Sequence, residues 1–188
     1  ERLAPLVFES LDWNHGVYLG ATVASERTAA AEGSVGEIRR DPMAMLPFCG
    51  YNMGEYFEHW IEMGKKIPKP PKIFHVNWFR KDANGKFLWP GYGENLRVLE
   101  WILARAAGTG KADKTAIGYL PTGDTLDLSG LNLSEGAMDQ LLSVKNEEWA
   151  GELDGVKTFF ERFGAKLPKE LWNQFNALKD RLKAKVAA

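Results

Sequence analysis

The segment 78–92 gathers aromatic side chains among residues that favour turns. Trp78, Phe79, Phe87, Trp89 and Tyr92 stand there among Asp, Asn, Gly and Pro. Rings carried on turns can offer their faces to a flat base, and each base–aromatic stack contributes about 1 to 3 kcal/mol without any charge. The same rings can instead be buried for packing, the commonest use of large aromatic residues. The residue types therefore predict either a purine platform or a piece of core.

Two turns should position these rings. Asn84-Gly85 is a strong signal for a two-residue hairpin turn, which would bring Phe79 and Phe87 close together. Pro90-Gly91-Tyr92-Gly93 then forces a tight backbone path with little side-chain bulk. The loop leads into a predicted helix, and such a junction is a common ligand site.

The predicted helix covers residues 96–107 and should be capped by Asn95. Its apolar residues recur at helical spacing, which indicates one face turned towards a core. We expect this inner face to carry Leu96, Leu99, Ile102, Leu103 and Ala106.

Two other candidate motifs fail the requirements of their chemistry. Gly108-Thr109-Gly110-Lys111 is not a phosphate loop, because Arg105 and Ala112 occupy positions that need glycine and a hydroxyl. A zinc site needs ligands that converge, whereas the three histidines lie on different predicted elements. Structural roles are therefore expected for His15, His59 and His75, and no metal site is predicted within the chain.

Composition indicates a soluble globular protein that acts on a small ligand. Hydrophobic residues make up 45% and charged residues 26% of the 188 residues, and the formal net charge is −1. This balance gives no general attraction to nucleic acid or to a membrane surface. Cys49 is the single cysteine, which excludes an internal disulfide and fits a reducing compartment, so the cytoplasm is the expected location.

The chain reads as an α/β (mixed α+β) protein, with a mixed sheet and flanking helices. Strands are predicted at 6–9, 16–24 and 72–79, and the small residues of 25–37 predict a mobile loop. Helices are predicted near 55–63, 134–143, 146–163 and 168–185. The last should bury Leu171, Phe175, Leu178 and Leu182.

Several of these stretches, in this order, resemble the GTP-dependent phosphoenolpyruvate carboxykinases. The longest is Phe74 to Asp82 followed by Lys86 to Asn95, which is similar to the guanine-binding signature of that family. The matches are dense over residues 5–105 and thin afterwards. Further matches are Pro5 to Ser10, Trp13-x-His15-Gly16-Val17, Thr28 to Glu32, Asp41 to Met45, and Pro47-Phe48-x-Gly50-Tyr51-Asn52.

The resemblance implies a guanine site in the segment 73–107. Phe79 and Tyr92 should sandwich the base, Phe87 should pack at its edge, and Asn95 should form a hydrogen bond with it. Many family members have phenylalanine where this chain has Tyr92. Because guanine and adenine differ in the donors and acceptors on their edges, a site built for GTP should reject ATP.

The resemblance also implies that residues 25–37 form a lid over the bound substrates. Glu32 should latch the closed lid, while Gly33 and Gly36 tolerate the changes of a hinge. Animal family members have histidine at the position of Gly33. A plain disordered loop is the other interpretation. The expected lid residues are Thr28, Ala29, Ala30, Ala31, Glu32 and Gly33.

The implied reaction converts oxaloacetate and GTP to phosphoenolpyruvate, GDP and CO₂, so the family acts as lyase and decarboxylase in gluconeogenesis. Manganese or magnesium would be bound mainly by residues outside this chain. The chain begins at Glu1, directly before a strand-like run, which favours a piece of a longer protein. The resemblance implies that this piece is the carboxy-terminal part and that the parent enzyme is a monomer. We expect residues 1–188 to form one part of its nucleotide-binding domain, with a helical tail over 134–188.

The family's phosphate loop, metal ligands and oxaloacetate-binding arginines precede the matched region. No catalytic set is therefore complete in this chain, and the chain alone is predicted to be inactive. Its partners would be GTP or GDP and, in the parent enzyme, oxaloacetate or phosphoenolpyruvate and the amino-terminal part. Two alternatives are a non-catalytic guanine-nucleotide-binding module and an interaction domain that binds no nucleotide.

Overall fold

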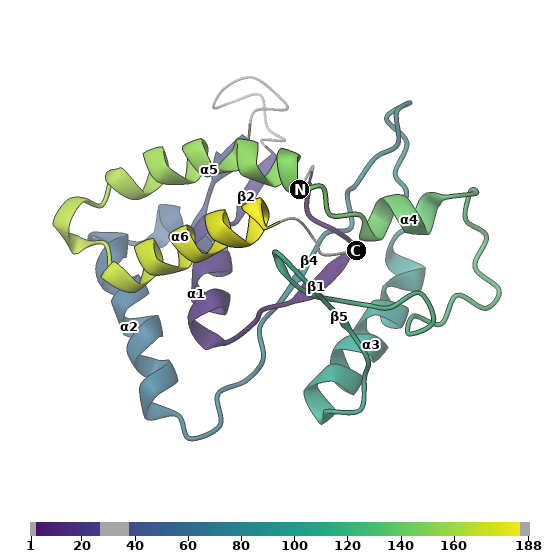
Figure 1. The fold of residues 1–188 in the computed structure, drawn as a ribbon, viewed down its shortest axis with the longest axis horizontal. Helices are drawn as coiled ribbons and strands as arrows, with labels where there is room; N and C mark the ends of the chain where they lie inside the picture. Colours follow the sequence, from purple (N-terminus) through teal and green to yellow (C-terminus); the bar gives the residue numbers. More distant parts are fainter. Residues whose placement is uncertain (1–2, 27–37, 185–188) are drawn as a thin grey trace. The chain divides into compact units, whose positions relative to one another are not determined.

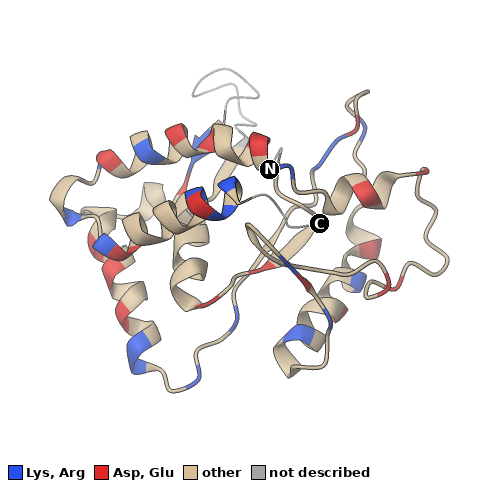
Figure 2. Ribbon diagram, in the orientation of Figure 1, with Lys and Arg blue, Asp and Glu red and all other residues tan. Residues whose placement is uncertain are grey.

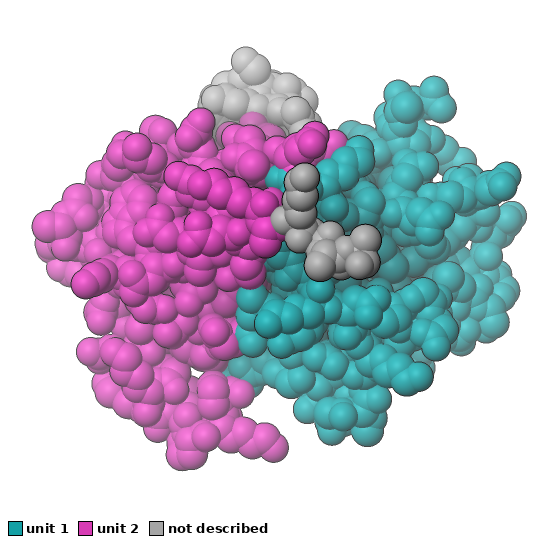
Figure 3. All heavy atoms as spheres, in the orientation of Figure 1, with its two compact units in different colours: residues 1–11, 71–146 teal, residues 12–70, 147–188 magenta. Residues whose placement is uncertain are grey.

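The computed structural model describes residues 3–26 and 38–184, which divide into two compact units. Unit 1 comprises residues 1–11 and 71–146, and unit 2 comprises residues 12–70 and 147–188 (Figure 3). The sequence predicted one part of a nucleotide-binding domain, with a helical tail over 134–188. That tail is divided between the units, since residues 134–146 lie in unit 1 and the remainder in unit 2.

Unit 1 is built on a four-stranded antiparallel sheet with the strand order β4-β1-β6-β5 (Figure 1). Residue Val7 pairs with Val76, and Glu9 pairs with Tyr119. The α/β class is confirmed, and the described pairs of this sheet are all antiparallel. The strands and helices of unit 1 are β1 (Val7–Glu9), β4 (Phe74–Val76), β5 (Asp113–Thr115), β6 (Gly118–Leu120), η4 (Tyr92–Glu94), α3 (Asn95–Ala107) and α4 (Ala137–Leu142).

One buried cluster ties α3 and α4 to the sheet of unit 1. The amide of Leu6 donates to the carbonyl of Leu141 at 2.8 Å. The buried carboxylate of Glu9 on β1 accepts from Arg105 on α3 at 2.5 Å and pairs with Lys72 at 2.9 Å. The buried core residues are Leu6, Val7, Leu88, Trp89, Val98, Trp101, Leu126, Ala137 and Leu141.

Unit 2 is mainly helical, and its helices pack around buried aromatic residues. Phe57 and Phe160 are fully buried, and all four residues predicted for the inner face of the last helix are buried. The elements are α1 (Trp13–Thr22), β2 (Ala24–Glu26), β3 (Ile38–Arg40), η2 (Pro42–Ala44), η3 (Leu46–Phe48), α2 (Met53–Lys66), α5 (Asn146–Glu161), η5 (Gly164–Lys166) and α6 (Lys169–Lys183).

The strand predicted over 16–24 is wrong, because this stretch is the helix α1 with β2 beginning only at Ala24. Asp12 caps the helix, and its Oδ1 accepts from the amide of His15 at 2.8 Å. Val17 and Ala21 recur at helical spacing on the buried side. Packing against α2 and α6 thus overrides the β propensity of the local residues.

The predicted inner face of α3 is mostly wrong, because only Ile102 of its five residues packs against the core. Val98 and Trp101 are the buried residues of this helix, whereas Leu96, Leu99 and Leu103 are exposed. The helix has apolar residues on two sides, so their spacing alone did not identify which side faces the core. Asn95 is the first helical residue rather than the cap, since η4 runs directly into α3 and Glu94 occupies the cap position.

Candidate nucleotide-binding surface

The aromatic segment of unit 1 begins as a hairpin arm after β4. The amide of Leu88 donates to the carbonyl of Arg80 at 2.9 Å, and that of Asp82 donates to Lys86 at 2.8 Å. The loop between Asp82 and Lys86 has three residues, not the two predicted. Gly85 adopts a φ of 79°, a left-handed conformation that glycine supplies without strain. The Asp82 carboxylate accepts from two backbone amides of this loop, which favours the longer turn.

The base of the arm is fixed by two polar side chains. Asn77 is 2% exposed, donates to the carbonyl of Ala4 at 2.8 Å and accepts from the amide of Phe79 at 3.1 Å. Arg80 donates to the carbonyl and to the hydroxyl of Ser143, at 3.2 and 2.9 Å. Phe79, which lies between these anchors, therefore has a defined backbone position.

The arm holds Phe79 and Phe87 against each other outside the core. Their ring centroids are 6.1 Å apart with an interplanar angle of 64°, an edge-to-face pair. The Lys81 ammonium lies 5.1 Å from the centroid of Phe87. Phe79 is 54% and Phe87 51% exposed, so about half of each residue's surface remains open to a ligand.

Tyr92 follows the tight turn that the sequence predicted. Gly91 has φ 109° and ψ −155°, a conformation that side chains disfavour, and its carbonyl accepts from the amide of Glu94 at 3.0 Å. Tyr92 is 95% exposed. In the described part of the chain it forms no ring contact with Phe79 or Phe87, so the structure brings two of the three predicted rings together.

Asn95 is held by a core tryptophan. The indole Nε1 of Trp89 donates to Oδ1 of Asn95 at 2.9 Å, and Trp89 itself is 1% exposed. An indole nitrogen can only donate, so this contact fixes which end of the Asn95 amide is oxygen. The amide nitrogen Nδ2 is thereby directed away from Trp89 as a remaining donor.

The start of α3 is further secured by Arg97. Its guanidinium donates to Glu94 at 2.6 Å and to the carbonyls of Asp127 and Ser129 at 2.7 and 3.0 Å. The hydrogen bond with Glu94 raises the pKa of Arg97. The residues around Asn95 are therefore set by side-chain contacts to a loop far along the chain.

The two sequence interpretations of the aromatic segment each hold for some of its rings. Trp89 belongs to the core and Trp78 packs partly against it, with ring centroids 6.4 Å apart. Phe79, Phe87 and Tyr92 are the exposed members. The exposed rings are the three that the family resemblance selected, although composition did not separate them from the tryptophans.

The remaining predicted motifs contribute no described site. The residues predicted for the lid lie outside the described part of the chain: Thr28, Ala29, Ala30, Ala31, Glu32 and Gly33.

Burial lowers the pKa of two of the three histidines, to about 3 for His15 and to about 4 for His75. Within residues 3–26 and 38–184, no group of three His, Cys, Asp or Glu side chains is placed to hold a metal ion. Gly108 ends α3 in a left-handed conformation, at the helix terminus that does not bind anions.

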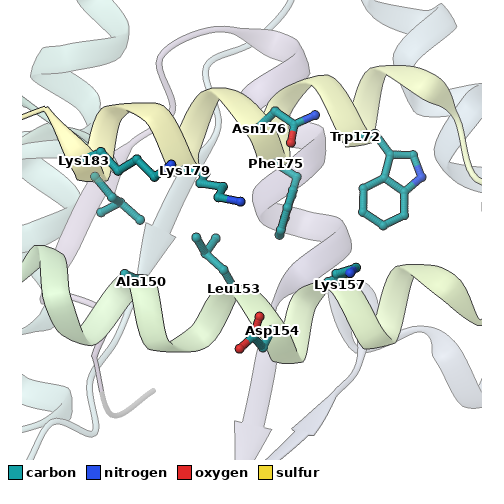
Figure 4. Close-up of a pocket in the computed structure, with 10 residues that line it drawn as sticks. Ala150, Leu153, Asp154, Lys157, Trp172, Phe175, Asn176, Lys179 and Lys183 are labelled. Carbon is teal, nitrogen blue, oxygen red and sulfur yellow. The ribbon is translucent and has the colours of Figure 1, made fainter.

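A groove between α5 and α6 was not predicted from the sequence. It has a volume of about 510 Å³ and is lined by apolar residues such as Leu153, Trp172 and Phe175, with Lys157 and Lys179 also in its wall (Figure 4). None of the residues predicted to bind nucleotide lines it. The longer helices α2, α3, α5 and α6 each carry both basic and acidic residues (Figure 2).

The family model of the phosphoenolpyruvate carboxykinase C-terminal P-loop domain matches residues 1–181. The chain belongs to this family. The carboxykinase of Anaeromyxobacter dehalogenans (strain 2CP-1), named phosphoenolpyruvate carboxykinase [GTP], is 54% identical over 180 residues, covering 96% of this chain and 30% of the relative. A relative of the same name from Thermoplasma volcanium is 52% identical, over 96% of this chain and 30% of its own length. Another, from Neocallimastix frontalis, is 54% identical, over 98% of this chain and 31% of its own length.

The chain thus spans about a third of the length of these carboxykinases. The match of the C-terminal domain model confirms the predicted family and the predicted carboxy-terminal position.

Proposed function

We propose that this chain supplies the guanine-binding surface and the lid of a GTP-dependent phosphoenolpyruvate carboxykinase. The full-length enzyme would convert oxaloacetate and GTP to phosphoenolpyruvate, GDP and CO₂. The observation that carries the proposal is the exposure of Phe79, Phe87 and Tyr92 beside tryptophans that are core.

Stacking accounts for the faces of the base. Phe79 has a fixed backbone position, and Tyr92 stands almost fully exposed on η4. In the proposed site these two rings would cover the two faces of a purine. Each stack would contribute about 1 to 3 kcal/mol. The edge-to-face contact with Phe79 keeps Phe87 beside the same base, where it would cover the edge.

The link between Trp89 and Asn95 supports selectivity for guanine. Oδ1 of Asn95 is engaged by the indole. The Nδ2 donor would therefore be the group that meets the base. Guanine presents the O6 acceptor at the position where adenine presents the N6 donor. A donor facing a donor leaves two polar groups unpaired, so ATP should be discriminated against.

The chemical step would draw on groups beyond this chain. Loss of CO₂ from oxaloacetate leaves an enolate, whose oxygen takes the γ-phosphoryl group of GTP, with GDP as the leaving group. As family membership suggests, manganese or magnesium would be bound mainly by residues outside this chain and would neutralise charge on the phosphoryl group. Residues 25–37, with Glu32 as latch, would shield the enolate from a proton that would give pyruvate.

A role in gluconeogenesis in the cytoplasm, with a monomeric parent enzyme, completes the proposal. Within the described residues, every helix is too short or too polar to cross a bilayer. The alternative function is a guanine-nucleotide-binding module without catalysis, which the same exposed rings would serve.

A chimera would test the proposal and its alternative. This chain would replace the corresponding segment of the Anaeromyxobacter dehalogenans carboxykinase, to which it is 54% identical. The chimera should form phosphoenolpyruvate from oxaloacetate, GTP and Mn²⁺, and the 188-residue chain alone should not. A chimera that binds GDP without turnover would favour the non-catalytic module, and one that binds neither GDP nor GTP would contradict the guanine site.

A further inference from the structure

A stripe of leucines runs along the outer face of α3. Leu96 is 65%, Leu99 44% and Leu103 66% exposed. Their spacing of three and four residues places them on one side of the helix, and Ala106, also exposed, continues the row. Single exposed leucines are common, but an uninterrupted apolar row at helical spacing marks a surface that packs against something.

The helix cannot turn this leucine stripe inward. Its other side is occupied by Val98 and Trp101, which are 0% and 2% exposed in the core of unit 1. Arg105 ties the helix to Glu9 on β1, and Arg97 ties its first turn to the loop at 127–129. Rotation about the helix axis would break all of these contacts together, so the stripe is a fixed outward surface.

Leaving the leucine stripe in water forgoes a substantial hydrophobic gain. Burying a leucine side chain is favourable because it removes apolar surface from water. The stripe is narrow, however, because it consists of three leucines on a helix of 13 residues. A stable dimer usually needs about 800 Å² from each partner, which this stripe alone does not supply. Contacts within one polypeptide can be smaller, since no translational freedom is lost when they form.

We propose that the leucine stripe is the surface on which the rest of the full-length carboxykinase packs an apolar element. The relatives provide the occupant, because this chain covers 30% of their length and leaves about 70% outside it. Spacing of three and four residues is the pattern on which a second helix packs closely, so the element is assigned as an amphipathic helix. This proposal depends on family membership and not on the guanine site.

Thiol accessibility tests the proposal. In a Cys49→Ser background, which removes the single native cysteine, Leu103→Cys would place one thiol on the stripe. Its reaction with a maleimide would be timed at the modified peptide by mass spectrometry, in the 188-residue chain and in the Anaeromyxobacter chimera. Each rate would be normalised to the same protein in denaturant. Leu96→Cys gives a second, independent reading, and Glu135→Cys on an exposed loop of unit 1 controls for general shielding.

We expect the stripe thiols to react at least about tenfold more slowly in the chimera than in the chain, with little change at Glu135→Cys. Equal rates in the two proteins, or equal protection at Glu135→Cys, would overturn the proposal. Protection that grows with the concentration of the 188-residue chain would identify a second copy as the occupant instead. Slow reaction in that chain at every concentration would show that the chain covers its own stripe, which also contradicts the proposal. None of these readings involves nucleotide, so they are independent of the proposed function.

Discussion

Two groups of aromatic residues in this protein differ in their exposure to solvent. In unit 2, Phe57, Phe159, Phe160 and Phe163 are 9% exposed or less and meet one another at ring-centroid distances of 5.0 to 6.3 Å. In unit 1, Phe79, Phe87 and Tyr92 are more than half exposed. The first group holds helices together, and the second group remains available to a ligand.

The backbone around each group explains the difference. The aromatic residues of unit 2 lie on helices or directly after them, where helical spacing directs them to one buried side. Those of unit 1 lie on a hairpin arm and on a short 3₁₀ turn, whose backbone bonds are local and whose side chains have little to pack against. An aromatic residue is therefore informative about binding only when its backbone setting is known.

The strongest way to test this comparison is to remove one ring from the buried group. Phe160 is fully buried and makes edge contacts with Tyr18 and Trp172 at centroid distances of 6.0 and 5.5 Å. Phe160→Ala should lower the free energy of unfolding by about 3 to 5 kcal/mol, as cavity-forming changes do. Denaturant titration by circular dichroism measures it. The matched variant Phe79→Ala should stay within about 0.5 kcal/mol of the native chain, and a comparable loss in both variants would erase the distinction between the groups.

Burial in unit 2 should also appear in the pH dependence of stability. His15 is 1% exposed, and burial lowers its pKa from 6.5 to about 3. Between these two values the unfolded chain binds the proton and the folded chain does not, so stability falls as the pH falls from about 6.5 towards 3. One such group contributes a slope of up to about 1.4 kcal/mol per pH unit.

Replacing His15 with glutamine should therefore flatten the loss of stability between pH 6 and pH 4, measured as denaturant midpoints along the pH series. His59 on the exposed side of α2 provides the control substitution, His59→Gln. An unchanged pH slope in His15→Gln would mean that the imidazole does not govern the acid sensitivity of unit 2.

The sequence predicted the amphipathic helices well, because α2, α5 and α6 each bury a single face. The sequence prediction failed for α1, because its β-branched and glycine residues favour a strand locally, whereas packing against neighbouring helices stabilises a helix. It failed for the inner side of α3 because both sides are apolar. The three-residue strands β5 and β6 carry too few residues to produce an alternating pattern.

The candidate site was only partly readable from the sequence. The family resemblance selected Phe79, Phe87 and Tyr92, whereas the residue types alone left a purine platform and a piece of core as alternatives. Residue types did not reveal that Trp89 on the same segment is core, or that its indole holds the Asn95 amide. Such contacts depend on the tertiary position of α3, which is set by residues far along the chain, such as Glu9 and Asp127.

The next test removes a ring from the exposed group. In the chimeric carboxykinase, Phe79→Ala should weaken GDP binding by about 1 to 3 kcal/mol, because one face of the base loses its stack. Isothermal titration with GDP measures the change. Phe48→Ala is the matched control, since Phe48 is 85% exposed but lies outside the aromatic segment. Unchanged GDP affinity in Phe79→Ala would show that the exposed group has no role in nucleotide binding.

A smaller effect is expected at the edge of the base. Asn95→Ala removes the Nδ2 donor and leaves the indole of Trp89 without its acceptor. The preference for GDP over ADP should fall by roughly tenfold, which corresponds to about 1.4 kcal/mol, a usual value for one lost hydrogen bond. Competition titrations with the two nucleotides measure it, with Asn173→Ala on α6 as the control. If the preference for GDP survives in Asn95→Ala, other groups must read the base.

The smallest effect is expected at Tyr92, and it separates two uses of one side chain. Its ring is proposed to stack on guanine, and its hydroxyl has no part in that stack. Because Tyr92 is 95% exposed, water can satisfy the hydroxyl both with and without nucleotide. Tyr92→Phe should therefore change GDP affinity by less than about 0.5 kcal/mol, whereas Tyr92→Ala should cost about as much as Phe79→Ala. Parallel GDP titrations of the two variants in the chimera show whether the ring or the hydroxyl contributes to binding. A large loss in Tyr92→Phe would assign the hydroxyl a direct polar contact with the ligand, and no loss in Tyr92→Ala would remove the second face of the proposed sandwich.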